Sequence, residues 1–479
     1  MDLGDSNWLG NFQCFEGAVQ RPCREQQLID ILTDEVRFPS PVRPMGSRHS
    51  MTECMVARRA GRWGTGVDMT GFTVLRNGKP LEVDVQQKTA VVPAGRIFIE
   101  VARELRETYD LTFNVLTEIG ALTIGAAACG ATKDSSTTGA GQHGQLCSGV
   151  IGMRLIQPNG VPRDLRRGVD QEFEALCCSY GLFGIVTEVT FQLVRHTLVS
   201  LRHECIPLEK FEERTNKLLQ DGNALFLYLF PYENPPRIVA EVRGNASTTR
   251  SSSDFLLRVR NRFWLKWLHR FVRVSRRLPA VVGNLQNAAL RCFLVRLLKI
   301  KAVSPVSHVV DFRERSPKFT FSMWAFPRDK FPGILRDYFE LCRQVQRAGG
   351  FRTLLPQVSY HIGQDRSSLL SYSHDGDVWS LDPIASGDEP GWHQFLDAFN
   401  AKCSAWGGKP LFNQTPQLTH QQVQHAFGSR LKRFEKTRRA FDPRDRMLND
   451  YFASLMPACA PAGASVPAAG SVALGDERG

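Results

Sequence analysis

The sequence predicts an α+β protein made of two main parts. Short alternating apolar runs over residues 66–92 are bounded by turn residues, and an amphipathic helix is expected after them, over 97–108. From about residue 200 the pattern changes to apolar strands separated by polar turns, over 200–250 and 305–385, which indicates a second, sheet-based domain. The length of 479 residues suits two or three domain-sized units.

The elements expected in the first part are mostly short. A helix over 24–34 precedes a strand at 36–38, and further strands are expected at 66–69, 72–75, 81–85 and 89–92. Two longer strand patterns, at 150–156 and 185–193, flank a helix expected at 171–180.

Later helices are predicted by apolar residues at helical spacing. They are expected over 329–348, 392–406 and 421–439, and the last ends before Asp442-Pro443. The tail over 458–479 is rich in Ala, Gly, Pro and Ser, a composition that predicts disorder.

Composition excludes several classes of protein. The 12 cysteines form no CxxC pair, which favours reduced thiols in a cytoplasm over a disulfide framework or a zinc site. The first residues lack the pattern of a secretory signal, and no run reaches the roughly 18 apolar residues of a spanning helix. The motifs GxSxG, HExxH and GxxxxGK are absent, so hydrolase, metalloprotease and P-loop interpretations have no support. A cytoplasmic location is expected.

The positive charge is concentrated in one insert. Residues 255–301 contain 12 basic residues and no acid, which equals the whole excess of 60 basic over 48 acidic residues. Aromatic residues recur every four positions from Phe263 to Phe271 with Arg or Lys between them, a pattern typical of a helix at a membrane interface. Packing on the protein core and guidance of an anionic or lipid-like substrate stay open as alternatives. Nucleic-acid binding is not expected, because no recognised motif accompanies the charge.

Two segments rich in small residues are candidate ligand sites. In the loop at 41–50, Gly46 lets backbone N–H groups close on an anion, and His49 is available for proton chemistry or for a bond to a cofactor. The segment at 118–139 is small-sided enough to lie against a flat, bulky ligand, although a linker or a tightly packed helix of small residues explains it equally well. A GxGxxG pattern at 139–144 follows a polar run and precedes a strand, so we reject a Rossmann site.

Three separated motifs together resemble one family. They are Gly46-Ser47-Arg48-His49-Ser50, Gly184-Ile185-Val186-Thr187-Glu188-Val189, and the segment 433–443 followed by Leu448-Asn449-Asp450-Tyr451-Phe452. In this order they resemble the FAD-linked oxidases of the vanillyl-alcohol-oxidase (PCMH) type, nearest the sugar-1,4-lactone (gulonolactone, arabinonolactone) and alditol oxidases.

The resemblance implies a two-part FAD-binding domain and a sheet-based substrate (cap) domain. The corresponding boundaries are 1–198 for the FAD-binding domain, 199–429 for the cap with its basic insert 255–301, 430–457 for a segment that returns to the FAD domain, and 458–479 for the tail. The resemblance makes His49 a covalent anchor for the flavin. The other positions that it assigns to the cofactor are Gly46, Ser47, Arg48, Ser50, Gly120, Gly125, Cys129, Thr132, Ser135, Ile185, Val186 and Asn449. Ala121 stands where some relatives have a second anchoring cysteine, so one covalent bond is expected.

Departures from the family pattern concern the substrate. Lys133-Asp134 replaces a His-Gly pair, residues 356–361 lack a Glu-x-Arg pair, and Gln414 stands at the position of an active-site lysine. Because unpaired buried polar groups are unfavourable, these losses predict a substrate less polar than a simple sugar lactone.

The activity expected is hydride transfer from a substrate CH–OH, or another activated C–H, to the flavin. Tyr360, His361 and Lys133 are the candidates for handling the hydroxyl proton, in that order. The substrate is expected to be a small molecule, with hydrophobic or anionic character left open, and peripheral membrane contact through 255–301 is the further possibility. The competing interpretations are a flavin-binding, membrane-docking protein without turnover and an oxidase of a lipid-linked sugar.

Overall fold

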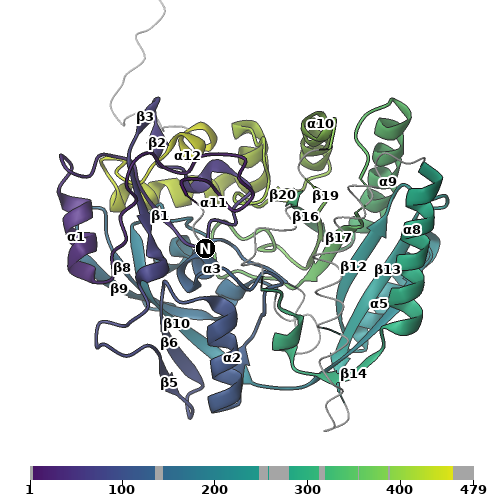
Figure 1. Cartoon of the computed structure of the whole chain (residues 1–479), viewed down its shortest axis with the longest axis horizontal. Helices are drawn as coiled ribbons and strands as arrows, with labels where there is room; N and C mark the ends of the chain where they lie inside the picture. Colours follow the sequence, from purple (N-terminus) through teal and green to yellow (C-terminus); the bar gives the residue numbers. More distant parts are fainter. Residues whose placement is uncertain are drawn as a thin grey trace, which may run out of the picture.

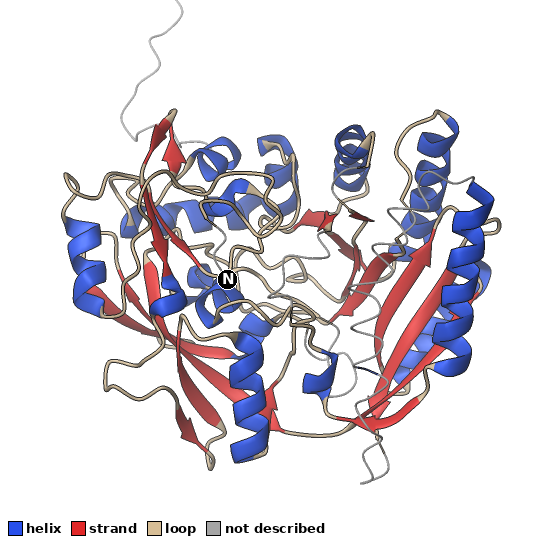
Figure 2. Ribbon diagram, in the orientation of Figure 1, coloured by secondary structure: helices blue, strands red, loops and turns tan. Residues whose placement is uncertain are grey.

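The computed structural model describes residues 4–134, 144–246, 257, 280–311, 319–353, 355–386 and 389–456. Two lobes, each built on its own antiparallel sheet, lie side by side (Figure 1), and helices pack against both sheets (Figure 2). The elements of the first lobe are α1 (Glu25–Thr33), β1 (Val42–Met45), β2 (Arg58–Arg59), β3 (Arg62–Trp63), β4 (Thr65–Asp68), β5 (Glu82–Asp84), β6 (Thr89–Pro93), α2 (Phe98–Tyr109), β7 (Leu111–Phe113), α3 (Ile124–Cys129), β8 (Val150–Ile156), β9 (Pro162–Arg166), α4 (Phe173–Leu176) and β10 (Ile185–Arg195).

The first lobe is organised around β10. This strand pairs with β6 and β8 and, at its end, with β7, in a six-stranded sheet of order β5-β6-β10-β8-β9. Helix α2 packs on the sheet through stacked rings, with the centroids of Phe98 and Phe113 4.9 Å apart and Phe113 edge-on to Phe191. A separate parallel pair, β1 with β4, carries the glycine loop that follows Met45.

The second lobe is an eight-stranded sheet of order β14-β11-β13-β12-β17-β18-β16-β20. Its elements are β11 (Val199–Ile206), α5 (Phe211–Gln220), β12 (Ala224–Phe230), β13 (Arg237–Asn245), α8 (Ala280–Cys292), β14 (Ile300–Val303), β15 (Thr320–Phe321), β16 (Trp324–Pro327), α9 (Phe331–Arg347), β17 (Gln357–Ile362), β18 (Val378–Leu381), β19 (Ile384–Ala385), α10 (Trp392–Ala405) and β20 (Lys409–Pro410).

The period-2 alternation of β12 separates the two faces of this sheet. Leu225, Leu227 and Leu229 belong to the core that the sheet shares with α5, α9 and α10. Phe226 and Tyr228 point the other way, into the core shared with the first lobe. The second lobe therefore presents an aromatic face to the first lobe.

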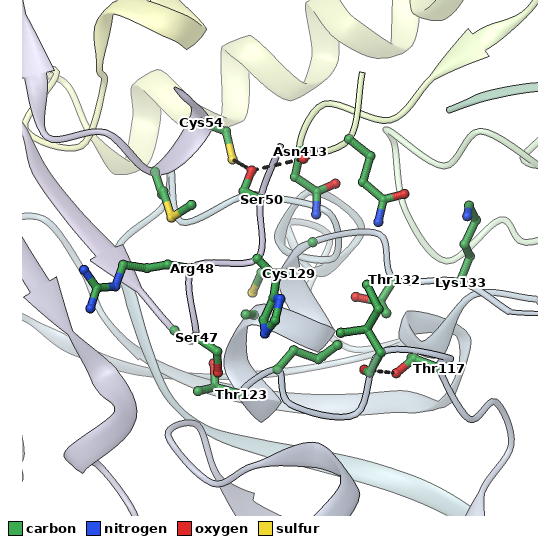
Figure 3. A pocket seen from close by; sticks show the side chains of 18 of the residues that line it. Ser47, Arg48, Ser50, Cys54, Thr117, Thr123, Cys129, Thr132, Lys133 and Asn413 are labelled. Atoms are coloured by element: carbon green, nitrogen blue, oxygen red, sulfur yellow. Dashed lines mark hydrogen bonds between the residues drawn. The ribbon is translucent and has the colours of Figure 1, made fainter. Parts of the chain in front are cut away.

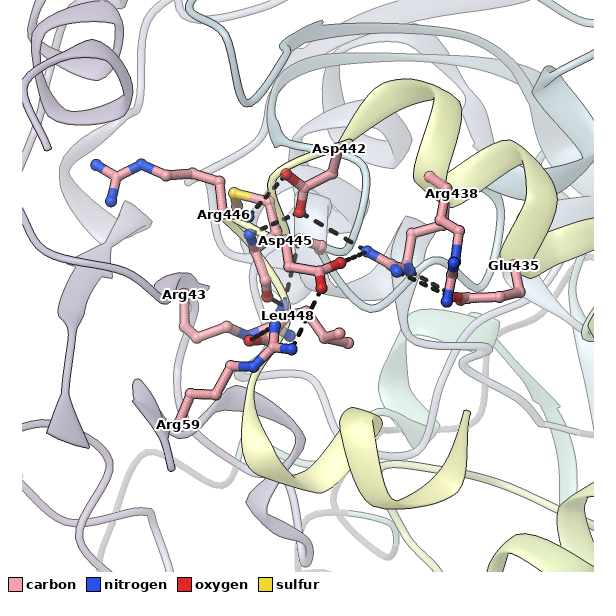
Figure 4. Close-up of polar contacts among 11 residues, drawn as sticks. Arg43, Arg59, Glu435, Arg438, Asp442, Asp445, Arg446 and Leu448 are labelled. Carbon is pink, nitrogen blue, oxygen red and sulfur yellow. Dashed lines mark hydrogen bonds and ion pairs between the residues drawn. The ribbon is translucent and has the colours of Figure 1, made fainter. Parts of the chain in front are cut away.

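The chain returns to the first lobe through α11 (His420–Phe441) and α12 (Asp450–Leu455), yellow in Figure 1. Gly428 breaks α11 with φ 49° and ψ −121°, a conformation that favours glycine, close to the expected boundary at 429/430. Past the helix, Arg446 donates to the carbonyl oxygens of Ile31, Leu32 and Phe38. Arg438 pairs with Glu435, at 2.8 Å, and with Asp445, so the returning segment is fixed by buried charges (Figure 4).

Most expected elements are present, and three differ. The strand expected at 36–38 is wrong: these residues form a turn, in which Phe38 N–H donates to Asp34 O and Val36 is 98% exposed. The strand expected at 72–75 is also wrong, because Leu75 closes a turn with Lys79. The helix expected at 171–180 is only Phe173–Leu176, since Cys178 has φ 60°.

Much of the basic insert lies outside the described residues, and so does the tail. Residues 258–279, which include the aromatic pattern, are among them. The described part of the insert contains α8, where Arg291 forms a 2.8 Å ion pair with Glu233. Within the described ranges, no helix is long and apolar enough to cross a membrane.

Candidate active site

A cavity of about 370 Å³ opens between the two lobes. The glycine loop after β1, the segment 117–133 and Asn413-Gln414 form its first-lobe side (Figure 3), while β12, β17 and residues 319–321 form the cap side. Two chain segments about 80 residues apart in sequence, and a third that follows β20 of the second lobe, therefore meet at one site.

The glycine loop and the small-residue segment touch directly. A Cβ added at Gly46 would lie 2.3 Å from Thr123 Oγ1, and one at Gly125 would lie 3.0 Å from Ala94 Cβ. Close approach excludes a side chain at Gly46, and one at Gly125 would require Ala94 to move by a few tenths of an ångström. Neither glycine has a positive φ, so the constraint at both positions is one of space. Both segments line the cavity, so their backbones can approach a ligand closely.

His49 lies in the cavity wall beside Trp8, whose ring centroid is 5.1 Å from that of the imidazole. Burial lowers the pKa of His49 to about 4, so the imidazole is neutral near pH 7. Arg48 has φ 57° and its guanidinium donates to the carbonyl oxygens of Gly4 and Ser6. In Figure 3 this side chain points away from the other labelled residues, so Arg48 fastens the N-terminal segment over the loop.

The segment after β20 completes the wall. Asn413 O accepts hydrogen bonds from Ser50 Oγ at 3.0 Å and from Met51 N at 2.9 Å. Its side-chain oxygen Oδ1, and Oε1 of Gln414, are buried and have no hydrogen-bond partner among the described residues. Two acceptors are thus available to a bound group with N–H or O–H donors.

Arg43 contributes a buried positive charge. Its guanidinium is 1% exposed and donates to the carbonyl oxygens of Cys54, Tyr180 and Met447 at 2.6 to 2.8 Å. No carboxylate of the described residues forms an ion pair with it, and burial lowers the pKa of Arg43 to about 10. A buried cation without a direct ion pair, on which Asp442 acts only at longer range, favours a negatively charged ligand such as one that carries phosphate.

A polar corner lies where the two sides of the cavity meet. Tyr360 Oη donates to Glu118 Oε2 at 2.6 Å, and Lys133 Nζ donates to Asp382 Oδ2 at 2.8 Å. The same ammonium lies 4.1 Å from the centroid of the Tyr360 ring. All four residues line the cavity, and burial raises the pKa of Tyr360 well above its ordinary value, so its phenol keeps its proton.

The model of the D-arabinono-1,4-lactone oxidase family matches residues 189–455, and an FAD binding domain model matches residues 17–166. The chain belongs to the D-arabinono-1,4-lactone oxidase family. It is 22% identical over 456 residues to an L-gulono-1,4-lactone dehydrogenase of Mycobacterium tuberculosis, found in two strains, with 93% of this chain and 97% of the relative covered.

Solved structures show the same fold. A cholesterol oxidase from B. sterolicum superposes with a TM-score of 0.75 at 15% identity, covering 94% of this chain and 96% of that one. A solvent-stable cholesterol oxidase superposes with a TM-score of 0.72 at 14% identity, covering 94% and 97%. The family and the two-part fold expected from the sequence are confirmed, and the protein is an FAD-dependent oxidoreductase acting on CH–OH donors of small molecules.

The cavity fits FAD on three observations. The loop is too close to Thr123 for any side chain at Gly46, the acceptors of Asn413 and Gln414 are free, and Arg43 has no counter-ion among the described residues. A diphosphate would supply the missing negative charge, and the donors of flavin and adenine would suit the free acceptors. Bound FAD supplies the two-electron redox chemistry, while the protein binds and orients the substrate.

The structure brings most of the expected cofactor positions of this flavoenzyme to the cavity. They are Gly46, Ser47, Arg48, His49, Ser50, Gly125, Cys129, Thr132 and Val186. Ile185, the neighbour of Val186 on β10, is fully buried in the core of α1 and β4 instead. Ser135 lies outside the described residues.

Two further positions support the cavity from behind. Gly120 donates its N–H to Val310 O, and a Cβ there would meet Val309 and Ile99. Asn449 caps α12 and donates to the carbonyl oxygens of Glu53, Cys54 and Val56. Asn449 therefore ties the returning segment to the loop region.

Of the three proposed catalytic side chains, the structure brings two together. Lys133 and Tyr360 are in contact at the cavity. His361 alternates to the other face of β17, where its ring lies edge-on to Trp379 at 5.2 Å. It does not line the cavity, and both ring nitrogens are buried without a hydrogen-bond partner among the described residues.

A buried charge network continues from this corner into the cap. Arg243 donates to Asp134 at 3.1 Å and to Glu241 at 2.9 Å, and Glu241 also contacts His203 at 3.1 Å. Burial alone would lower the pKa of Arg243, but the two carboxylates raise it above its ordinary value. Sequence reasoning missed Arg43, Glu118, Asp382 and the ion pair of Arg243 with Glu241. The one signal was Glu241-Val242-Arg243, two opposite charges on one face of an apolar strand.

Proposed function

We propose that this flavoenzyme oxidises a hydroxyl group on a substrate whose body is mostly apolar. The observation that carries the proposal is the cap wall of the cavity, which is lined by aromatic and aliphatic side chains. They are Phe226, Tyr228, Val310, Phe319, Phe321, Pro356, Val358 and Ile384. Three charged groups of the described wall, Glu118, Lys133 and Asp382, form one corner. The other two, Arg43 and Arg48, lie on the opposite side, and their guanidinium groups donate to backbone carbonyl oxygens.

This distribution argues against a polyol. A substrate with hydroxyl groups along its length needs a polar partner for each one when it is buried, and unpaired groups are unfavourable. One polar corner on an apolar wall instead suits one reacting hydroxyl on a hydrophobic body. Gln414, which carries no charge, stands in the wall where the family pattern has a lysine.

Flavin reduction by a panel of alcohols tests this proposal. Under anaerobic conditions, bleaching of the visible flavin band is followed with cholesterol, L-gulono-1,4-lactone and D-arabinono-1,4-lactone. We expect cholesterol, or a smaller apolar secondary alcohol such as cyclohexanol, to reduce the flavin faster than either lactone. The proposal is wrong if a lactone is the fastest of the panel.

The proposal includes a covalent bond from a ring nitrogen of His49 to the 8-methyl carbon of FAD. A methyl C–H bond would break, its proton would leave, and its two electrons would reduce the flavin, which the electron acceptor of turnover would reoxidise. Support comes from the position of His49 in the cavity wall and from burial, which lowers its pKa to about 4 and so leaves a nitrogen lone pair free for bond formation. Acid precipitation should leave yellow flavin attached to the wild-type protein and to a His393→Ala control at an exposed position, but not to His49→Ala. Flavin that stays attached to His49→Ala would refute the assignment.

Tyr360 and Lys133 are the proposed contacts to the reacting end of the substrate, because both line the polar corner. His361, the remaining candidate, faces Asp377 at 3.7 Å on the other side of the sheet. It could influence the reaction only by holding β17 in place.

Peripheral membrane contact through 255–301, from a cytoplasmic location, completes the proposal. Its support is the basic and aromatic pattern of the sequence, together with the eleven described cysteines, which form no disulfide. Flotation with liposomes that contain anionic lipid should be lost when Arg262, Lys266, Arg270 and Arg273 are neutralised together. Unchanged flotation would remove membrane contact from the proposal and leave the alcohol oxidation untouched.

A further inference from the structure

Asp382 is the polar group of the cavity whose arrangement is not explained by the protein alone. It follows β18 directly, is 2% exposed and lines the cavity. Lys133 Nζ donates to its Oδ2 at 2.8 Å, while Oδ1 is buried and has no hydrogen-bond partner among the described residues. A buried carboxylate oxygen without a donor is unfavourable, so a donor from a bound molecule belongs at this position.

The neighbouring groups are poorer acceptors for a hydroxyl proton. Tyr360 Oη already donates to Glu118, and its phenol is protonated. Lys133 is a cation with donors only, and one of them is occupied by Asp382. Sequence reasoning named both Tyr360 and Lys133 as candidate bases, and the geometry favours the neighbouring carboxylate of Asp382.

We propose that Asp382 Oδ1 accepts the hydrogen bond of the substrate hydroxyl and then takes its proton. The inference rests on the proposed alcohol oxidation. As the C–H hydrogen leaves with two electrons for the flavin, the O–H bond breaks, its proton moves to Oδ1, and its electron pair forms the C=O bond. The alcohol is oxidised to a carbonyl and the flavin is reduced, so atoms and electrons balance.

Lys133 is a positioning residue in this scheme. By holding Oδ2 it leaves Oδ1 as the carboxylate oxygen without a donor among the described residues, and its charge favours the ionised carboxylate. Burial raises the pKa of Asp382, and the ammonium of Lys133, followed by the hydroxyl of Ser380, opposes that rise. The other titratable groups that face Asp382 are Tyr360 and Glu118, with Asp134 next to Lys133 in the chain and paired with Arg243.

The first test measures binding and needs no turnover. Cyclohexanol and cyclohexanone are mixed at increasing concentrations with the oxidised, FAD-loaded protein, and the change in flavin absorbance on mixing, recorded before any reduction of the flavin, gives each Kd. A carboxylate accepts from the alcohol and repels the ketone oxygen, whereas an amide can donate to the ketone. We expect the wild type to prefer the alcohol, and D382N to shift the ratio of the two Kd values toward the ketone by about tenfold or more.

The matched control is D377N, at the other end of the same strand. Asp377 lines a different hollow and its side chain is 39% exposed, so the change removes one carboxylate without touching the cavity. D377N should keep the wild-type ratio of Kd values. An unchanged ratio in D382N overturns the proposal, and so does the absence of any flavin response to either probe in the wild type.

The second test measures flavin reduction. With the fastest alcohol of the panel, D382N should reduce its flavin about 10²- to 10⁴-fold more slowly at normal FAD content, the range for loss of a general base. In K133M the acid limb of the pH–rate profile should move to higher pH, because the cation no longer favours the ionised form. A D382N rate within threefold of wild type overturns the assignment. If no alcohol reduces the flavin, alcohol oxidation fails as the function, while the binding ratio still decides whether Asp382 receives a hydroxyl.

Discussion

The contact between Gly46 and Thr123 gives the sharpest test of how the glycine loop packs against the segment 120–125 in the cofactor site. In Gly46→Ala the new methyl group would lie 2.3 Å from Thr123 Oγ1 and 3.2 Å from both Thr123 Cβ and Cγ2. A contact at 2.3 Å is far inside van der Waals distance, so either the loop or the segment 120–125 must shift. Both of these line the cavity, and FAD binding should weaken together with stability.

The magnitude follows from the kind of contact. One extra methyl group forced into a packed site lowers the free energy of unfolding by about 1–3 kcal/mol. Thr123→Ala removes Oγ1 and Cγ2 and leaves the nearest contact at about 3.2 Å, a distance that a small shift relieves. The double variant should therefore recover most of the loss, and the two changes should be clearly non-additive.

Two quantities are measured for each variant: the free energy of unfolding, from urea unfolding, and the flavin content of the purified protein. Gly333→Ala is the control, because a Cβ at this position in α9 meets nothing within 4 Å. It should leave flavin content unchanged and raise stability by up to about 1 kcal/mol through helix propensity. Gly46→Ala with wild-type stability and flavin content, or a double variant no better than Gly46→Ala, would refute the proposed contact.

Two further changes test buried groups elsewhere. In Arg43→Lys the ammonium cannot reach all the carbonyl oxygens to which the guanidinium donates. We therefore expect flavin content to fall and the free energy of unfolding to decrease by about 2 kcal/mol or more, measured by urea unfolding with and without added FAD. Wild-type flavin content and stability in this variant would mean that the guanidinium is not required. For His361, burial lowers the pKa from 6.5 to about 4. The unfolded state therefore binds more protons between these values, and stability is lost as pH falls from 6.5 toward 4. Between pH 7 and pH 5 the wild type should lose about 2 kcal/mol that His361→Phe retains, and equal slopes in the two proteins would contradict a neutral buried imidazole.

The fold was predictable where periodicity and burial agree. The alternation of β10 and the apolar spacing of α9 both appear in the structure at nearly their expected bounds. The strand predictions at 36–38 and 72–75 were wrong for opposite reasons. Val36 is an apolar residue with no strand to pair with and lies in solvent, while Phe72 and Leu75 are buried through a turn and not through a strand. Tertiary contacts decide whether such short apolar runs form strands.

The site was predictable where its residues are contiguous. The loop around His49 and the segment around Cys129 were recognisable because each carries several positions of one motif. Asp382 and Lys133 are 249 residues apart, and only the pairing of β17 with its neighbours brings Asp382 to the corner. No local pattern marks either residue, so sequence reasoning reached Lys133 only through a family comparison and did not reach Asp382.

The return of the chain to the first lobe has a consequence for biosynthesis. The hydrogen bond of Ser50 needs Asn413, which is synthesised 363 residues later, and that of Arg43 needs Met447, which is synthesised 404 residues later. At roughly 5–20 residues per second, a ribosome needs about 20–80 s to supply these partners after it has made the loop. During that interval the nascent first lobe has the glycine loop after β1 but lacks Asn413-Gln414, which complete the cavity wall. Flavin loading is therefore expected after synthesis of residue 447, and fragments that stop before Asn413 should leave the ribosome colourless.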